Sequence, residues 1–202
     1  MHISEGVLSA PVLIGCGAAA ATCTAVGLKK LDMDRIMHVS LLTSTFFVAS
    51  LIHVPLGPAS IHLVLNGLLG IVLGWVCFPA IVTALLLQAL LFQYGGITVL
   101  GVNTIIMALP AVFAYYIVRP WLVSGGGKRA VAAFLAGFIT ILFSSILLAL
   151  ALVTSDKGFF HSASILLAAQ FPLMIVEGFI TMFAVHFLAK VQPDFLYSEA
   201  LQ

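Results

Sequence analysis

Apolar residues fill this chain in long, nearly unbroken runs separated by short polar or glycine- and proline-rich stretches. A helix of roughly 20 apolar residues crosses a bilayer core. The runs of about this kind cover residues 8–28, 36–53, 61–78, 79–94, 104–123, 130–153 and 163–190. Backbone N–H and C=O groups in lipid must form hydrogen bonds with one another, so these runs are expected to be helices. The pattern predicts an all-α, polytopic membrane protein with about seven transmembrane helices in one domain, 1–202.

Two stretches between the runs contain too much glycine or proline for a stable helix. Residues 95–103, GGITVLGVN, are predicted to form a loop or a re-entrant segment, and residues 54–60, VPLGPAS, a turn-containing loop. Residues 191–202 form a short polar tail. These boundaries leave residues 1–7 as a separate N-terminal segment.

Basic residues predict how the chain is oriented, because short cytoplasmic loops collect Lys and Arg. With seven spans, the first loop, the fifth loop and the C-terminus lie on one side of the membrane. That side holds Lys29, Lys30, Arg35, Arg119, Lys128, Arg129 and Lys190, whereas Lys157 alone falls opposite. We therefore expect the N-terminus outside and the C-terminus in the cytoplasm.

Composition supports this class and excludes others. Hydrophobic residues make up 62% of the chain and charged residues 7%, and the mean hydropathy is +1.23. The net charge of +1 gives no basic excess for nucleic acid. The stretch SGGGKR lacks the upstream glycine of a P-loop, so this chain is not expected to hydrolyse ATP, and no HExxH motif indicates a metalloprotease.

The opening residues, MHISEG, contain an unusual set of nitrogen donors. No basic segment of a secretory signal precedes the first apolar run, so we expect these residues to remain on the protein. The α-amine of Met1, with a pKa of about 7.7 to 8.0, the amide nitrogen of His2 and the His2 imidazole can close two adjacent chelate rings. Planar nitrogen ligation suits Ni(II) or Cu(II), and Co(II) can adopt it. A histidine at position two could equally be a packing residue.

A fourth nitrogen would have to come from another outer segment. His53 and His62 flank the loop at 54–60. Asn66 follows His62 at the four-residue spacing of one helical face, as an orienting neighbour would. For either histidine, packing at the membrane surface is the alternative interpretation.

Four motifs together resemble the CbiM/NikM family, the substrate-binding membrane component of energy-coupling factor (ECF) importers for cobalt and nickel. They are MHISEG, GPASIHLVLNGLLG, GGITVLGVNT and PLMIVEG. The resemblance implies a seven-helix protein of the bacterial inner membrane whose N-terminus reaches into the molecule. It implies metal ligands at Met1, His2 and His62, with Co²⁺ or Ni²⁺ as the transported ligand and no organic cofactor. The implied partners are a transmembrane coupling component, two ATP-binding cassette ATPases and a small auxiliary membrane subunit.

The same resemblance implies supporting residues around the ion. Glu5 and Asn103 would fix the N-terminal segment and the loop, and Ser60 and Asn66 would flank the histidine ligand. Tyr94 stands before Gly95-Gly96 where cobalt relatives commonly have histidine. Cobalt and nickel therefore both stay open.

Glu177 is an acidic residue in the last apolar run, where an unpaired charge is costly. We expect a hydrogen-bonded helix clamp, with a proton relay as the alternative. On the second interpretation the chain would be an autonomous ion-coupled metal carrier. A membrane metalloenzyme is the remaining alternative to a non-enzymatic transport component.

Overall fold

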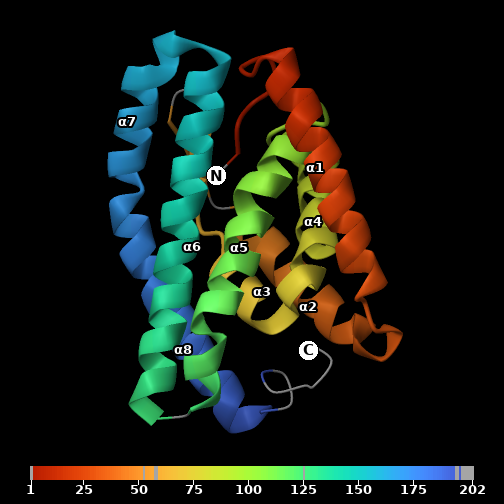
Figure 1. The fold of residues 1–202 in the computed structure, drawn as a ribbon, viewed down its shortest axis with the longest axis vertical. Helices are drawn as coiled ribbons and strands as arrows, with labels where there is room; N and C mark the ends of the chain where they lie inside the picture. The colour runs from red at the N-terminus through yellow and green to blue at the C-terminus, as the bar shows by residue number, and fades with distance from the viewer. Residues whose placement is uncertain (1, 52, 57–58, 125, 194–195, 197–202) are drawn as a thin grey trace.

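The computed structural model describes all residues except 1, 52, 57–58, 125, 194–195 and 197–202, and the side chains of 53–56, 59–61 and 123 are also not described. Eight α-helices and one β-hairpin make up the described part of the chain (Figure 1). The helices are α1 (Ala10–Lys29), α2 (Ile36–Ala49), α3 (Asn66–Leu73), α4 (Cys77–Phe92), α5 (Leu100–Val123), α6 (Gly126–Ser155), α7 (Phe160–Ala169) and α8 (Phe171–Val191), and the strands are β1 (His53–Leu56) and β2 (Ala59–His62).

Among the residues that the structure describes, five helical segments are long and apolar enough to cross a membrane, which makes the chain a multi-pass membrane protein. They are α1, α3 with α4 (Asn66–Phe92), most of α5 (Leu100–Leu122), α6, and α7 with α8 (Lys157–Val191). The helix α2 has only 14 residues. A break separates α3 from α4 at Gly74, whose φ of 53° is one that glycine adopts readily.

The prediction of one helix over 61–78 is wrong. Strand β2 continues to His62, and α3 begins only at Asn66 and ends at Leu73. The predicted loop at 54–60 belongs to the antiparallel hairpin of β1 and β2, in which His53 pairs with His62. A short apolar run does not distinguish strand from helix by its periodicity, and here the strand takes the first part of the run. The predicted loop at 95–103 is confirmed only as far as Val99, because α5 starts at Leu100.

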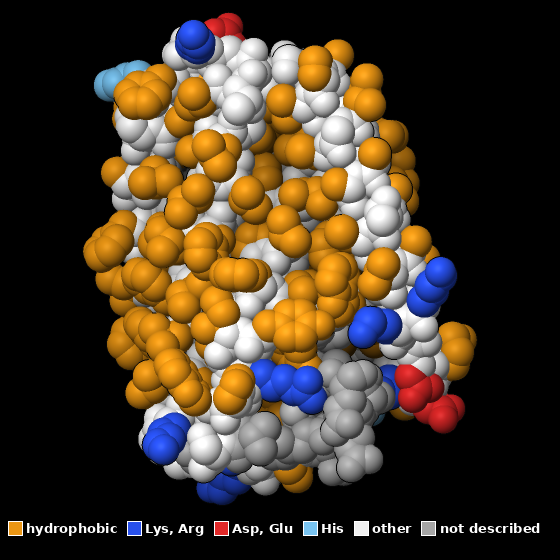
Figure 2. All heavy atoms as spheres, viewed as in Figure 1, with side chains coloured by type: hydrophobic (Ala, Val, Ile, Leu, Met, Phe, Trp, Pro, Cys, Tyr) orange, Lys and Arg blue, Asp and Glu red, His pale blue; other side chains and the backbone are white. Residues whose placement is uncertain are grey.

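The helix α5 lies at the centre of the molecule. It packs against α6, α3, α1 and α4, while α6 also runs along α8 (Figure 1). Ile106 and Met107 of α5, Leu69 of α3 and Ile141 of α6 are fully buried. Apolar side chains also cover the outer surface, as expected for helices that face lipid (Figure 2).

Basic side chains gather at one end of the molecule. Lys29 ends α1, Lys128 lies in the first turn of α6 and Lys190 in the last turn of α8, and all three helix ends lie in the lower half of the molecule in Figure 1. Figure 2 shows most of the Lys and Arg side chains of this face at that end. The clustering predicted from the loops is therefore present in three dimensions.

Gly27 lets α1 approach α4 closely. A Cβ atom at Gly27 would lie 2.5 Å from Cδ of Pro79 and 2.6 Å from the carbonyl oxygen of Trp75. A Cβ atom at Gly15, on the same helix, would meet nothing within 4 Å. We expect Gly27→Ala to push α1 away and lower the free energy of unfolding by about 1–3 kcal/mol.

The matched control is Gly15→Ala, which should leave the stability unchanged or raise it by up to about 1 kcal/mol through better helix propensity. Thermal unfolding in detergent checks both variants. Equal unfolding midpoints for the two variants would contradict this packing.

Candidate metal centre

The N-terminal segment enters the molecule instead of lying on its surface. Figure 1 shows its trace running inward from the start of α1 to a position beside α5 and α6. The His2 side chain is 4% exposed, and Ile3 is fully buried in the core. An exposed end of chain would leave the His2 imidazole in solvent, so its burial needs a specific cause.

Two buried imidazoles meet at this point. The rings of His2 and His62 are stacked, with centroids 4.5 Å apart and planes 22° from parallel. His62 is 3% exposed. One ring comes from the N-terminal segment and the other from the end of β2, so two parts of the chain 60 residues apart supply adjacent nitrogen donors.

Asn103 holds the segment in place from α5. Its Oδ1 accepts a hydrogen bond from the backbone N–H of Ile3 at 2.9 Å, and its Nδ2 donates to the backbone carbonyl of Ile3 at 3.2 Å. The amide group satisfies both polar groups of a buried residue next to His2. Asn103 was one of the supporting residues expected from the sequence, and this contact gives it a definite partner.

Glu5 makes the second attachment. Its Oε1 accepts from the backbone N–H of Thr98 at 2.9 Å and from the Thr98 hydroxyl at 3.0 Å, and the backbone hydrogen bond is the main reason that the pKa of Glu5 lies below its ordinary value. Thr98 is a partner that the sequence analysis did not identify, although it lies within the predicted loop motif. Gly96, at a φ of 131°, leaves room for Glu5, because a Cβ atom there would collide with the carboxyl group.

The His62 ring is oriented by its own backbone. Nδ1 lies 3.0 Å from the carbonyl oxygen of Leu63. Since a carbonyl only accepts, Nδ1 carries the proton and the lone pair is on Nε2. Burial lowers the pKa of His62 to about 4, so the imidazole is neutral at pH 7, which is the form that binds metal.

The four-residue spacing does not make Asn66 a helical neighbour of His62. Its Nδ2 donates to the carbonyl oxygen of Met107 at 3.1 Å and to the hydroxyl of Ser144 at 3.3 Å. The two residues share no helical face, because His62 ends a strand and Leu65, in a left-handed conformation, separates that strand from α3. Asn66 therefore joins α3 to α5 and α6.

The structure does not describe the side chains of three other expected site residues. Met1 lies outside the described residues, and only the backbone of His53 and Ser60 is described. The hairpin register nevertheless places the His53 backbone opposite that of His62.

Glu177 of α8 forms the expected hydrogen-bonded clamp. Its carboxyl group accepts hydrogen bonds from the backbone N–H groups of Val64 and Leu65, with Leu65 N 3.0 Å from Oε1 and 3.1 Å from Oε2. The partners are on the linker that follows His62. The sequence could not identify them, since no pattern relates α8 to a backbone segment more than 100 residues earlier.

Side chains alone do not complete a metal site in the described part of the chain. No group of three or more His, Cys, Asp or Glu side chains lies close enough there to share an ion. Backbone or terminal nitrogens would have to supplement His2 and His62.

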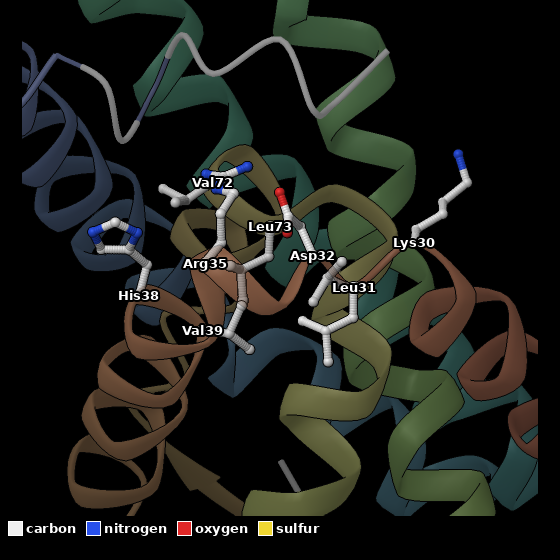
Figure 3. Close-up of a pocket in the computed structure, with 9 residues that line it drawn as sticks. Lys30, Leu31, Asp32, Arg35, His38, Val39, Val72 and Leu73 are labelled. Carbon is white, nitrogen blue, oxygen red and sulfur yellow. The ribbon is translucent and has the colours of Figure 1, made fainter.

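A pocket elsewhere in the molecule suits a cation poorly. It lies where α2 begins beside the end of α3 and is lined by Lys30, Asp32, Arg35, His38 and Leu73, among others (Figure 3). Its two cationic groups outnumber its one carboxylate. The pair formed by His2 and His62 is therefore the better candidate for a divalent metal.

These features define a multi-pass membrane protein with two buried imidazoles brought together by an inserted N-terminal segment. Residues 2–195 match the family described as "Cobalt uptake substrate-specific transmembrane region" (CbiM). This chain belongs to the CbiM family, and it is a cobalt or nickel uptake transport component of the CbiM/NikM type.

Individual relatives agree with this family. A protein of Haemophilus influenzae whose name refers to metal transport is 39% identical over 197 residues, with 96% of each chain covered. The cobalt transport protein CbiM of Sorangium cellulosum is 31% identical, covering 97% of this chain and 94% of its own length. The fused nickel transport protein NikMN of Rhodobacter capsulatus is 31% identical over 185 residues, which are 87% of this chain and 53% of the fused protein.

The fold also has a solved counterpart. The crystal structure of a transition metal transporter superimposes with a TM-score of 0.84 at 30% identity, covering 95% of this chain and 93% of that one. The relatives are named as transport proteins, which agrees with a chain that is not an enzyme.

Removing the Asn103 amide should loosen the N-terminal segment. In Asn103→Ala both polar groups of Ile3 lose their partner, which costs about 1–3 kcal/mol. We expect amide hydrogen exchange in the peptide containing residues 2–5 to accelerate about tenfold or more.

Thr104→Val is the control, because the Thr104 hydroxyl bonds only to the carbonyl of Leu100 within α5 among the hydrogen bonds described. Exchange in this variant should match the wild type. Unchanged exchange in Asn103→Ala would show that Asn103 does not hold the segment.

Proposed function

We propose that this chain is the substrate-capture component of an ECF-type importer that takes up divalent cobalt or nickel across the bacterial inner membrane. The observation that carries the proposal is the burial of His2 against His62 at a ring separation of 4.5 Å. The two imidazoles place nitrogen donors at a buried position, next to the N-terminal segment, where an ion can be enclosed.

The proposed ligands are the amine of Met1, the amide nitrogen and imidazole of His2, and the imidazole of His62. The two attachments favour this set, because Asn103 holds the backbone of Ile3, directly after His2, and Glu5 holds the segment two residues further on. The lone pair on His62 Nε2 and the neutral state of that ring suit coordination. Four nitrogens with two fused chelate rings favour a planar arrangement, as Ni(II) prefers.

We propose that the end bearing most basic residues faces the cytoplasm, with the N-terminus outside. The distribution of Lys and Arg supports this orientation. We propose that α2 crosses as well, and that β2, the linker after it and α3 together cross separately from α4, which would bring the crossings to seven. The ion would then be captured near the outer face.

Transport would need partners, since this chain has no nucleotide-binding motif. We propose a transmembrane coupling component, two ATPases and a small auxiliary membrane subunit. The fusion of nickel transport modules in the relative from Rhodobacter capsulatus supports association with further components. The helix α1 is the least buried of the candidate spans, since only Ala20 and Gly27 of its 20 residues are buried, and its small residues suit close contact with the coupling component.

A one-residue extension of the N-terminus tests the ligand set. Placing Ala before Met1 keeps the His2 side chain but moves the free amine and changes the chelate rings. We expect the affinity for Ni²⁺, measured by competition with a chelator, to fall by at least about 100-fold, as should that of His62→Ala.

His161→Ala is the matched control, because this histidine is exposed in α7. Its affinity should stay within twofold of the wild type. Full affinity in the extended chain would rule out the terminal amine as a ligand.

Reconstitution distinguishes an ECF component from an autonomous carrier. We expect liposomes that contain this chain alone to accumulate no ⁶³Ni²⁺ under a proton gradient, because no motif for energy coupling is present. Addition of the coupling component and ATPases should give ATP-dependent uptake. Gradient-driven uptake by the chain alone would establish the carrier instead.

A further inference from the structure

The carboxyl group of Glu177 binds the backbone that leads away from His62. The Glu177 side chain is fully buried on α8, and its hydrogen bonds go to the N–H groups of Val64 and Leu65. These amides follow His62 by two and three residues. A buried carboxyl group without such partners would be strongly unfavourable, so the fold requires these hydrogen bonds.

One peptide group connects this contact to the His62 ring. The carbonyl of Leu63, which accepts from His62 Nδ1 at 3.0 Å, and the N–H of Val64, which donates to Glu177, belong to the same planar unit. The orientation of that plane determines where the carbonyl points, and the carbonyl determines which ring nitrogen carries the proton. Glu177 thus acts on the His62 ring through a single rigid group.

The contact with Glu177 also stabilises an unfavourable backbone conformation at Leu65. Leu65 has a φ of 56°, a left-handed conformation that residues other than glycine avoid. Its N–H is bound by both oxygens of Glu177. The carboxyl group also lies at the N-terminus of α3, where the helix dipole favours negative charge.

Close backbone contacts fix the distance between α8 and the His62 segment. A Cβ atom at Gly67 of α3 would lie 2.8 Å from Cα of Gly137 on α6, and one at Gly137 would lie 2.5 Å from the carbonyl oxygen of Glu177. The three helices are therefore stacked with little space between their backbones. This stacking explains how a short acidic side chain on α8 reaches the linker before α3.

We propose that Glu177 is a positioning residue for metal capture, which sets the tautomer and direction of the His62 imidazole through the peptide between Leu63 and Val64. The inference rests on the proposed function, in which His62 is a ligand. A clamp that only joins helices would affect stability and leave the ring unchanged. Glu177 itself does not touch the ion.

The test is Glu177→Gln in the full chain with its native N-terminus. The amide preserves the shape but presents an NH₂ group to a backbone donor. We expect the affinity for Ni²⁺ to fall about 10- to 100-fold, the usual effect of removing a group that orients a ligand, and the absorption band of the bound nickel to shift. The control is Thr181→Val, a change at a buried residue one turn further along α8. Its affinity for Ni²⁺ should stay within twofold of the wild type, and its nickel absorption band should not shift.

Spectra of ¹⁵N-histidine-labelled protein without metal supply an independent measurement. The wild type should show His62 protonated at Nδ1, and Glu177→Gln should show a mixture of tautomers. If Glu177→Gln does not fold, Glu177→Asp retains the carboxyl group on a shorter side chain and should give a smaller loss of affinity in the same direction.

The outcomes separate the two proposals. A wild-type chain that binds no Ni²⁺ while the tautomer still depends on Glu177 overturns the proposed function and leaves the contact intact. A variant at position 177 with a lower unfolding midpoint but wild-type affinity, nickel band and His62 tautomer overturns the positioning role.

Discussion

The whole site depends on burying the start of the chain between helices. A buried peptide segment must have hydrogen-bond partners for its backbone, and the Asn103 amide provides both for Ile3. Glu5 attaches the next turn to Thr98. Together these contacts explain how a polar histidine at position two comes to be 4% exposed in a protein of the membrane.

The second half of the site comes from a local departure from helical structure. The end of β2 at His62 and the left-handed Leu65 occupy the start of an apolar run that was predicted to be helical. Such backbone is tolerated at membrane depth only where protein buries it and satisfies its polar groups. Glu177 accepts hydrogen bonds from the N–H groups of Val64 and Leu65 in this irregular backbone. The residue that satisfies these groups is therefore bound to the linker that directly follows His62.

Hydropathy was sufficient to predict the long helices, and the N-terminal chelate pattern together with the family motifs predicted that His2 and His62 belong together. The stacked pair agrees with that prediction. The hairpin and the partners of Asn66 and Glu177 could not be predicted, because an apolar run does not reveal its conformation and no sequence pattern relates α8 to the linker before α3. Thr98 was missed for a different reason, since one of its two hydrogen bonds to Glu5 uses a backbone N–H that any residue would supply, and a hydroxyl within a loop motif does not indicate its partner.

The proposed nitrogen chelate is tested most directly by X-ray absorption spectroscopy of the nickel-loaded full chain with an unmodified N-terminus. We expect a four-coordinate, planar Ni(II) centre with nitrogen ligands that include two imidazoles. A six-coordinate centre dominated by oxygen, or one with a single imidazole, would contradict capture of the ion between His2 and His62.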